Sequence, residues 1–159
     1  MWFRSGDLMR KDKDAYLYFV DRLGDSFRWK GENVSTGEVA AVFSALPGIE
    51  EANVYGVSVP GAEGRAGMAA IVAPGVDFAA LRKHVMDNLP PYARPVFLRV
   101  MPELEITGTF KYRKADMVEQ GFDPAKVKHA LYFDDSSAGA YVPLDAALYQ
   151  RIISGGVRL

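Results

Sequence analysis

Two stretches of the sequence combine glycine with charged side chains, as a ligand-binding loop requires. In the first, residues 105–114 read Glu-Ile-Thr-Gly-Thr-Phe-Lys-Tyr-Arg-Lys, so a polar loop at 107–109 precedes Lys111. The backbone amides of such a loop can face an anion, and the ammonium group of lysine is a compact positive charge. Lys111 is therefore a candidate phosphate ligand, although a lysine near a helix start is more often an ordinary surface residue.

The second stretch, residues 21–39, changes chain direction several times. It leaves a strand, turns, and enters a short strand over 26–30 that alternates polar and aromatic residues. A tight turn is predicted at 31–33, and Ser35 then begins a helix, with Glu38 three residues later as in a capping box. Glycine and charged residues thus lie where a loop would face a ligand.

Composition narrows the classes of function. The chain has 159 residues, 49% of them hydrophobic and 25% charged, which is typical of a globular domain. A net charge of -1 argues against nucleic acid or an anionic membrane as the main partner. Without cysteine there are no disulfides or thiolate metal sites. The sequence shows neither a signal peptide nor an apolar run of the roughly 18–20 residues that a membrane span needs, which favours the cytoplasm.

The remaining pattern predicts an α+β fold with a three-stranded sheet, flanking helices and an N-terminal hairpin. Asp77 is expected to cap one helix. The glycine-rich segment 61–67 lacks the lysine and serine or threonine of a phosphate-binding loop, so a hairpin connection is favoured there. Helices are predicted over 35–46, 77–88 and 113–120, and strands over 16–21, 26–30, 49–59, 68–73 and 96–101.

Residues 127–159 are interpreted as a C-terminal extension. The extension begins as a strand or extended arm near Leu131, passes a turn at 136–140, and ends in a helix that Gly155 stops. Its short apolar face and sparse basic residues favour an arm that wraps the domain over a membrane-surface helix.

The second stretch carries a family resemblance. Its spacing fits the pattern R-x-x-D-x-x-[KR]-x-x-G-x-x-[IV]-x-x-x-E, with Arg22, Asp25, Arg28, Gly31, Val34 and Glu38 at the defined positions. This pattern resembles the hinge-and-loop motif of the adenylate-forming enzymes, which include acyl-CoA synthetases, luciferases and peptide-synthetase adenylation domains. The run from Asp21 to Thr36 is similar to the branch that contains fatty acid transport proteins and very-long-chain acyl-CoA synthetases.

The first stretch resembles a second motif of the same enzymes, T-x-[ST]-G-K-[IV]-x-R, whose lysine reaches the adenylating site. Phe110 replaces the usual glycine and Lys114 the usual arginine. Aligning Gly108 with the family glycine instead would put Thr109 at the lysine position. The resemblance therefore implies Lys111 as the adenylating lysine, with Lys114 as the second choice.

The resemblance implies a two-step fatty acid–CoA ligase that uses ATP and CoA as substrates and releases AMP and diphosphate. Asp7 would bind the ribose hydroxyls, and the alternative is a residue that caps a turn. Arg22 would contact the same nucleotide, and the alternative is a partner in a surface ion pair. The CoA-side loop would consist of Gly31, Glu32 and Asn33. The alternative is that these residues form an ordinary hairpin turn. Magnesium would arrive with ATP, without a ligand from this chain.

The resemblance also implies how the chain is divided. Residues 1–20 would be the boundary of a preceding large domain, 21–24 the hinge, 25–126 the mobile C-terminal domain and 127–159 the extension. Asp21, Arg22 and Gly24 are the hinge candidates, although many relatives carry an acidic residue in place of Gly24.

Partners follow from this division. The chain would work with an N-terminal adenylation domain of the same parent chain and would be inactive alone. Separation from that domain would expose apolar surface, through which the separated domain could dimerise. A membrane-peripheral parent is compatible with this interpretation. The alternatives are an interaction module on the same fold and part of a fatty acyl-AMP ligase. The two histidines and two tryptophans are assigned to structure: His84, His129, Trp2 and Trp29.

Overall fold

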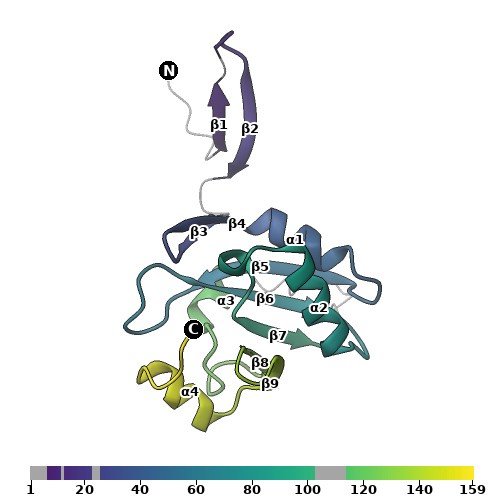
Figure 1. Ribbon diagram of the computed structural model, residues 1–159, viewed down its shortest axis with the longest axis vertical. Helices are drawn as coiled ribbons and strands as arrows, with labels where there is room; N and C mark the ends of the chain where they lie inside the picture. Colours follow the sequence, from purple (N-terminus) through teal and green to yellow (C-terminus); the bar gives the residue numbers. More distant parts are fainter. Residues whose placement is uncertain (1–6, 12, 23–25, 103–113) are drawn as a thin grey trace.

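The computed structural model describes residues 7–11, 13–22, 26–102 and 114–159. These residues form an α+β fold, which confirms the predicted class (Figure 1). The elements in chain order are β1 (Asp7–Lys11), β2 (Leu17–Arg22), β3 (Ser26–Trp29), β4 (Glu32–Ser35), α1 (Thr36–Ser44), β5 (Glu51–Val57), β6 (Ala66–Val72), α2 (Phe78–Asn88), the 3-10 helix η1 (Pro91–Ala93), β7 (Phe97–Met101), α3 (Lys114–Gln120), β8 (Ala130–Asp135), β9 (Ala140–Pro143) and α4 (Ala146–Ile153).

A five-stranded sheet in the order β5-β6-β7-β8-β9 is the centre of the fold. The pair β6–β7 is parallel and is joined through α2, whereas the other three pairs are antiparallel. Every residue of β6 is buried, as expected for a strand that is covered on both faces.

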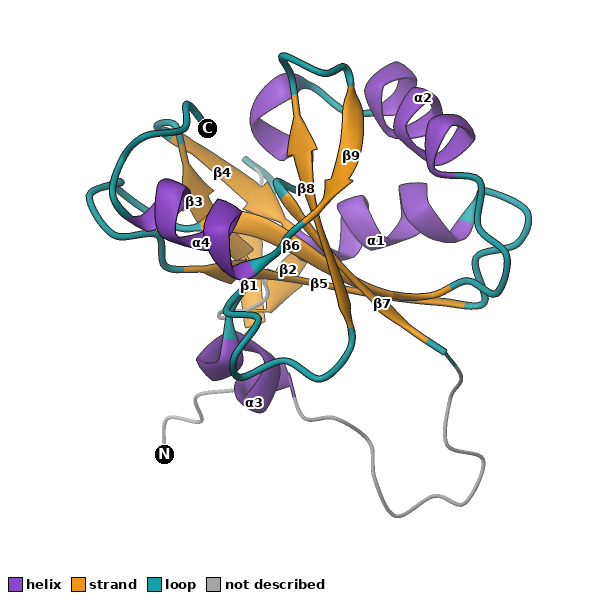
Figure 2. Ribbon diagram, turned by 90° about the horizontal axis from the view of Figure 1, so that it is seen from below, coloured by secondary structure: helices purple, strands orange, loops and turns teal. Residues whose placement is uncertain are grey.

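Helices cover both faces of this sheet (Figure 2). Helices α1 and α2 lie side by side, and the Nε2 atom of His84 lies 2.6 Å from the Val42 carbonyl oxygen. On the opposite face, Phe122 follows α3, stacks on Phe97 of β7 and makes an edge contact with Tyr149 of α4. Aromatic packing therefore holds α3 and α4 over one face while α1 and α2 cover the other.

Side-chain caps fix where the helices begin. The Ser35 hydroxyl accepts a hydrogen bond from the Glu38 amide at 3.4 Å, which confirms the predicted cap of α1. The Asp77 carboxylate accepts from the amides of Ala79 and Ala80 at 3.0 and 3.2 Å, and α2 ends at Asn88 as predicted. Asp145 caps α4 in the same way.

The sheet is larger than the three strands expected from the sequence. The two additional strands, β8 and β9, come from residues 127–159 and extend the sheet beyond β7. That segment is therefore not only an arm around the domain, because its backbone hydrogen bonds complete the sheet. The short strand β9 was missed because its pairing depends on β8 rather than on its own four residues.

One turn also differs from the sequence prediction. The turn of the β3–β4 hairpin consists of Lys30 and Gly31, while Glu32 and Asn33 belong to β4. Near the N-terminus, Arg10 and Lys11, the first two residues of a charged run, belong to β1. Strand β1 pairs with β2 as a separate two-stranded sheet, which Figure 1 shows apart from the five-stranded sheet.

Candidate functional site

The β3–β4 hairpin carries one of the two motifs, and its turn has an unusual backbone. Lys30 and Gly31 have φ values of 51° and 79°, so both central residues lie in the left-handed region, as in a type I′ turn. Such a turn matches the twist of the two strands, which pair Trp29 with Glu32. The turn residues are exposed, whereas Trp29 beneath them is buried.

A glycine-rich connection holds the hairpin from one side. Gly64 has a φ of 74° and forms a bridge with Trp29, and a Cβ atom at Gly64 would lie 2.2 Å from the Arg28 carbonyl oxygen. The amide of Arg65 donates to that same oxygen at 2.8 Å. The segment predicted as a plain connection between strands therefore also fixes the position of β3.

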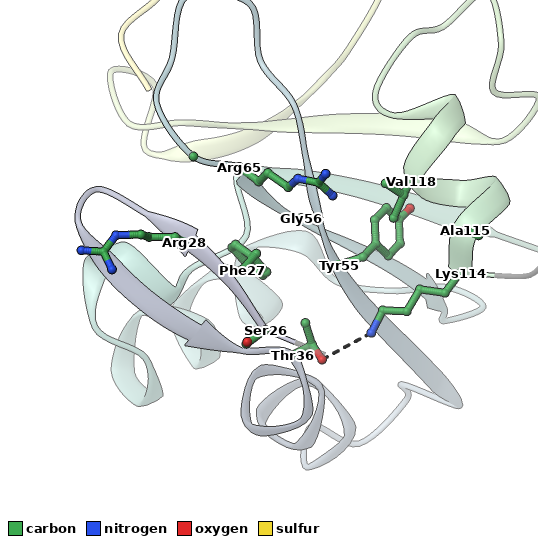
Figure 3. A pocket seen from close by; sticks show the side chains of 11 residues that line it. Ser26, Phe27, Arg28, Thr36, Tyr55, Gly56, Arg65, Lys114, Ala115 and Val118 are labelled. Carbon is green, nitrogen blue, oxygen red and sulfur yellow. Dashed lines mark hydrogen bonds between the residues drawn. The ribbon is translucent and has the colours of Figure 1, made fainter. Parts of the chain in front are cut away.

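A cavity of about 660 Å³ lies between β3, β5 and the first turn of α3 (Figure 3). Lys114 extends across it, and its Nζ atom donates to the Thr36 hydroxyl at 3.3 Å. The cationic side chains in the lining are those of Arg28, Arg65 and Lys114, and the described lining contains no carboxylate. In Figure 3 the guanidinium of Arg65 points towards α3, while that of Arg28 points away from it.

The charge of this cavity favours an anionic group. Opposite charges attract more strongly where water is partly excluded, and backbone and hydroxyl donors add hydrogen bonds to an anion. Ser26 and Thr36 supply hydroxyl groups to the lining, and Tyr55 closes one wall. Burial raises the pKa of Tyr55 to about 12, although the positive charge of Arg99 acts in the opposite direction. The tyrosine is therefore neutral at physiological pH.

A buried arginine lies behind this wall. The side chain of Arg99 in β7 is 1% exposed, and its Nη1 atom donates to Gln120 Oε1 at 2.7 Å. Its Nε atom donates to His129 Nδ1 at 3.0 Å. His129 must therefore leave Nδ1 unprotonated, and burial, together with the Arg99 charge, lowers the pKa of this histidine. The arginine connects β7 with the end of α3 and with the segment before β8.

The structure places the site residues predicted from the sequence in different parts of the molecule. Lys111 and Gly24 lie outside the described residues. The backbones of Asp7 and Arg22 are directly paired in the β1–β2 hairpin, and Asp21 pairs with the residue after Asp7. The structure therefore brings the two nucleotide-binding candidates together in one strand pair.

The other candidates lie at opposite ends of the β3–β4 hairpin. Gly31 is in the turn, and Glu32 and Asn33 follow it as exposed residues of β4. Lys114 is at the other end, beside Thr36. The second-choice lysine and the predicted CoA-side loop are thus not parts of one cluster.

Several residues around the cavity were not identified as site candidates from the sequence. Arg28 occupies the basic position of the hinge-and-loop pattern, which could have marked it. Arg65 follows two closely spaced glycines. Arg99 is the one charged residue of an otherwise apolar strand, a pattern that indicates a partnered buried charge.

Two features are absent from the part of the chain that the structure describes. Within the ranges given above, no three or more histidine, aspartate or glutamate side chains gather as a metal ion would require. In the same part of the chain, no helix has both the length and the apolar character to cross a membrane.

Comparison with known proteins identifies the domain. Residues 38–111 match the family model of the AMP-binding enzyme C-terminal domain. Long-chain fatty acid transport protein 3 of Homo sapiens is 51% identical over 162 residues, which cover all of this chain and 24% of that protein. The chain therefore spans about a quarter of the length of the curated relatives that it matches.

Solved structures agree with this assignment. A fatty acyl CoA synthetase of Mycobacterium tuberculosis has a TM-score of 0.56 and 30% identity, covering 75% of this chain and 24% of that one. The O-succinylbenzoate coenzyme A synthetase of Bacillus subtilis, solved in complex with ATP and magnesium ion, has a TM-score of 0.55 and 30% identity, covering 65% and 21%. The chain therefore carries an AMP-binding enzyme C-terminal domain, and over its whole length it is similar to the long-chain fatty acid transport proteins.

Proposed function

We propose that this chain is the mobile C-terminal domain of a fatty acyl-CoA synthetase, which converts ATP, a fatty acid and CoA into acyl-CoA, AMP and diphosphate. The observation that carries the proposal is the 48–51% identity to fatty acid transport proteins over almost the whole chain, including both motifs. The cation-lined cavity at the start of α3 adds support, because α3 directly follows the segment that contains Lys111.

In the first step, a fatty acid carboxylate oxygen attacks the α-phosphorus of ATP and the bond to diphosphate breaks. Negative charge accumulates on the phosphoryl oxygens, and the Lys111 ammonium group stabilises it. Asp7 accepts hydrogen bonds from the ribose hydroxyls, and Arg22 contacts the same nucleotide. The pairing of β1 with β2 supports this assignment, because it places these two residues opposite each other.

In the second step, the CoA thiol loses its proton and attacks the acyl carbonyl, and AMP leaves. The domain first rotates about Asp21, Arg22 and Gly24, which lie at or just after the end of β2. Gly31, Glu32 and Asn33 then line the passage of the pantetheine chain. The exposed turn supports this role, because a glycine in the left-handed region lets a ligand approach the backbone closely.

The proposed partner is an N-terminal adenylation domain of the same parent chain, without which this domain is inactive. Magnesium arrives with ATP and receives no ligand from this chain. We place the enzyme in the cytoplasm or at the surface of a membrane. Dimerisation of the separated domain remains a prediction, which size-exclusion chromatography would test.

The test is to compare two half-reactions in the full-length parent, with Lys111→Ala and the control Lys114→Ala. Fatty-acid-dependent ATP–diphosphate exchange reports adenylation, and CoA consumption with supplied acyl-adenylate reports transfer. Lys111→Ala should lower exchange by about 100- to 1000-fold and leave transfer intact, as expected for one lost transition-state donor. Lys114→Ala should have a smaller effect on exchange.

Other outcomes would point to other functions. If Lys114→Ala abolishes exchange and Lys111→Ala does not, the second-choice lysine is the adenylating residue. If the wild-type enzyme forms acyl-adenylate but does not use free CoA, it is a fatty acyl-AMP ligase. If the wild type catalyses neither half-reaction with any fatty acid, the ligase proposal fails and the interaction module takes its place.

A further inference from the structure

The end of α4 reverses the chain through a defined helix cap. Gly155 has a φ of 80°, its amide donates to the Ile152 carbonyl at 3.1 Å, and the Gly156 amide donates to the Arg151 carbonyl at 2.8 Å. These two bonds form a Schellman motif, in which glycine adopts the left-handed conformation just beyond the helix. The motif fixes the direction in which residues 157–159 leave the helix.

The reversed segment runs to the turn of the β3–β4 hairpin. Figure 2 shows the C-terminus beside the β3–β4 hairpin. Val157 and Leu159 are partly buried against the core, and with Trp29 and Lys30 they line a hollow of about 390 Å³. Leu159 and Arg158 line a second hollow of about 280 Å³ with the same two hairpin residues. The last residues of the chain therefore lie between two hollows that both border the turn.

Trp29 is consequently bordered by two different segments. Its backbone bridges Gly64, and residues 59–63 of the same connection line the first hollow. Val157, Leu159 and the buried Ile152 line the hollow from the side of α4. The tryptophan side chain is only 5% exposed although it immediately precedes an exposed turn. Removing apolar area from 157–159 should therefore expose Trp29 and loosen the turn.

We infer that Val157 and Leu159 are positioning residues for the Lys30–Gly31 turn, and that the extension thereby supports the CoA-transfer step. The inference rests on the proposed function for its catalytic consequence, because that proposal places the CoA-side loop at this turn. The matched family region, residues 38–111, contains neither the turn nor the extension, whereas the similarity to the fatty acid transport proteins covers both.

The test combines Val157→Ser with Leu159→Ser and uses Leu148→Ser as the matched control. Leu148 is another partly buried leucine of the same extension, and it lines neither hollow. In the full-length parent, the double variant should raise the KM for CoA or slow CoA transfer by at least about tenfold, because a displacement of ~1 Å can cost ~100-fold in rate. Diphosphate exchange should stay within about twofold of the wild type, and Leu148→Ser should leave the ratio of the two half-reactions unchanged.

A second measurement tests the packing without any catalysis. The 159-residue chain has two tryptophans, so Trp2→Phe leaves Trp29 as the only one. In that background, Val157→Ser/Leu159→Ser should shift tryptophan emission to longer wavelength, and Leu148→Ser should not. Unchanged emission, or an equal loss of both half-reactions, would overturn the positioning role. If the wild type lacks both half-reactions while the emission shift occurs, the proposed function fails but the packing part stands.

Discussion

The two ends of the β3–β4 hairpin offer different chemistry to a ligand. At the end near Ser26 and Thr36, cationic side chains border a cavity, and Lys114 reaches into it from α3. At the other end, the Lys30–Gly31 turn is exposed, and an apolar tryptophan lies beneath it. One end thus presents positive charge, and the other presents an exposed backbone turn.

Under the proposed function, this one rigid element would serve both reaction steps of a small domain. The hairpin pairs without a bulge over four residue pairs, so its two ends keep a fixed separation. Only their supports differ, since α3 borders the charged end and the last residues of the chain border the turn. A substitution at one end should therefore leave the other end unaffected, unless it disturbs the hairpin itself.

Gly64→Ala should have the largest effect, because it disturbs the support that both ends share. A Cβ atom 2.2 Å from the Arg28 carbonyl oxygen requires β3 to move, and the φ of 74° adds strain. We expect a loss of about 3 kcal/mol in the free energy of unfolding, measured by urea denaturation. The control Gly61→Ala has a similar φ but no atom within 4 Å, and should lose only about 1 kcal/mol. Equal losses would show that the close approach does not matter.

Arg99→Met should weaken only the charged end. The substitution leaves Gln120 Oε1 and His129 Nδ1 without this donor inside the domain. Both acceptors are only partly buried, so a loss of about 1 kcal/mol for each, and about 2 kcal/mol in all, is expected. Adenylation should fall more than CoA transfer, because α3 follows the Lys111 segment. An equal decrease in both half-reactions would contradict this separation.

Gly31→Ala should weaken only the turn. Its φ of 79° disfavours a side chain, although no atom lies within 4 Å of the added Cβ. The expected cost is about 1 kcal/mol in unfolding free energy, with slower CoA transfer and unchanged diphosphate exchange. Gly48→Ala, at a distant turn with a φ of 98°, is the control for strain alone. If both variants slow CoA transfer equally, the turn has no special role.

The smallest effect should come from acid. Burial and Arg99 lower the pKa of His129, so the folded state prefers the neutral ring. The stability contributed by this preference is fully present above the unfolded-state pKa of about 6.5 and is lost as the pH falls towards the folded-state value. The free energy of unfolding, measured from pH 7.5 to 5, should therefore decrease more in the wild type than in His129→Asn. Parallel pH curves would exclude a contribution from this histidine.

Local signals predicted much of the fold. Ser35 and Asp77 were identified as caps because a capping hydrogen bond depends on residues only two or three positions apart. The β3–β4 hairpin was also expected, but its turn was placed one residue too late, because lysine is an unusual residue in the left-handed region. Strand β9 was not predicted, because four residues acquire a strand conformation only through their partner.

The site was predicted less completely, for a related physical reason. Motif spacing gives the candidates Lys111 and Gly31, but it does not reveal that Arg65 and Thr36 border one cavity. Arg99 was not identified from the sequence because its partners, Gln120 and His129, lie 21 and 30 residues away along the chain. The sequence specifies which side chains are available, whereas tertiary packing decides which of them meet.

The late position of β8 has a consequence for synthesis of the protein. Until residues 130–135 have left the ribosome, β7 is an unpaired edge of a growing sheet, and its neighbour β6 is entirely apolar. Open apolar edges recruit strands of other chains, and a charge that points into the sheet face discourages this. Arg99 provides such a charge in the middle of β7. We therefore expect Arg99, which is deeply buried in the finished domain, to oppose such pairing while β8 is still missing.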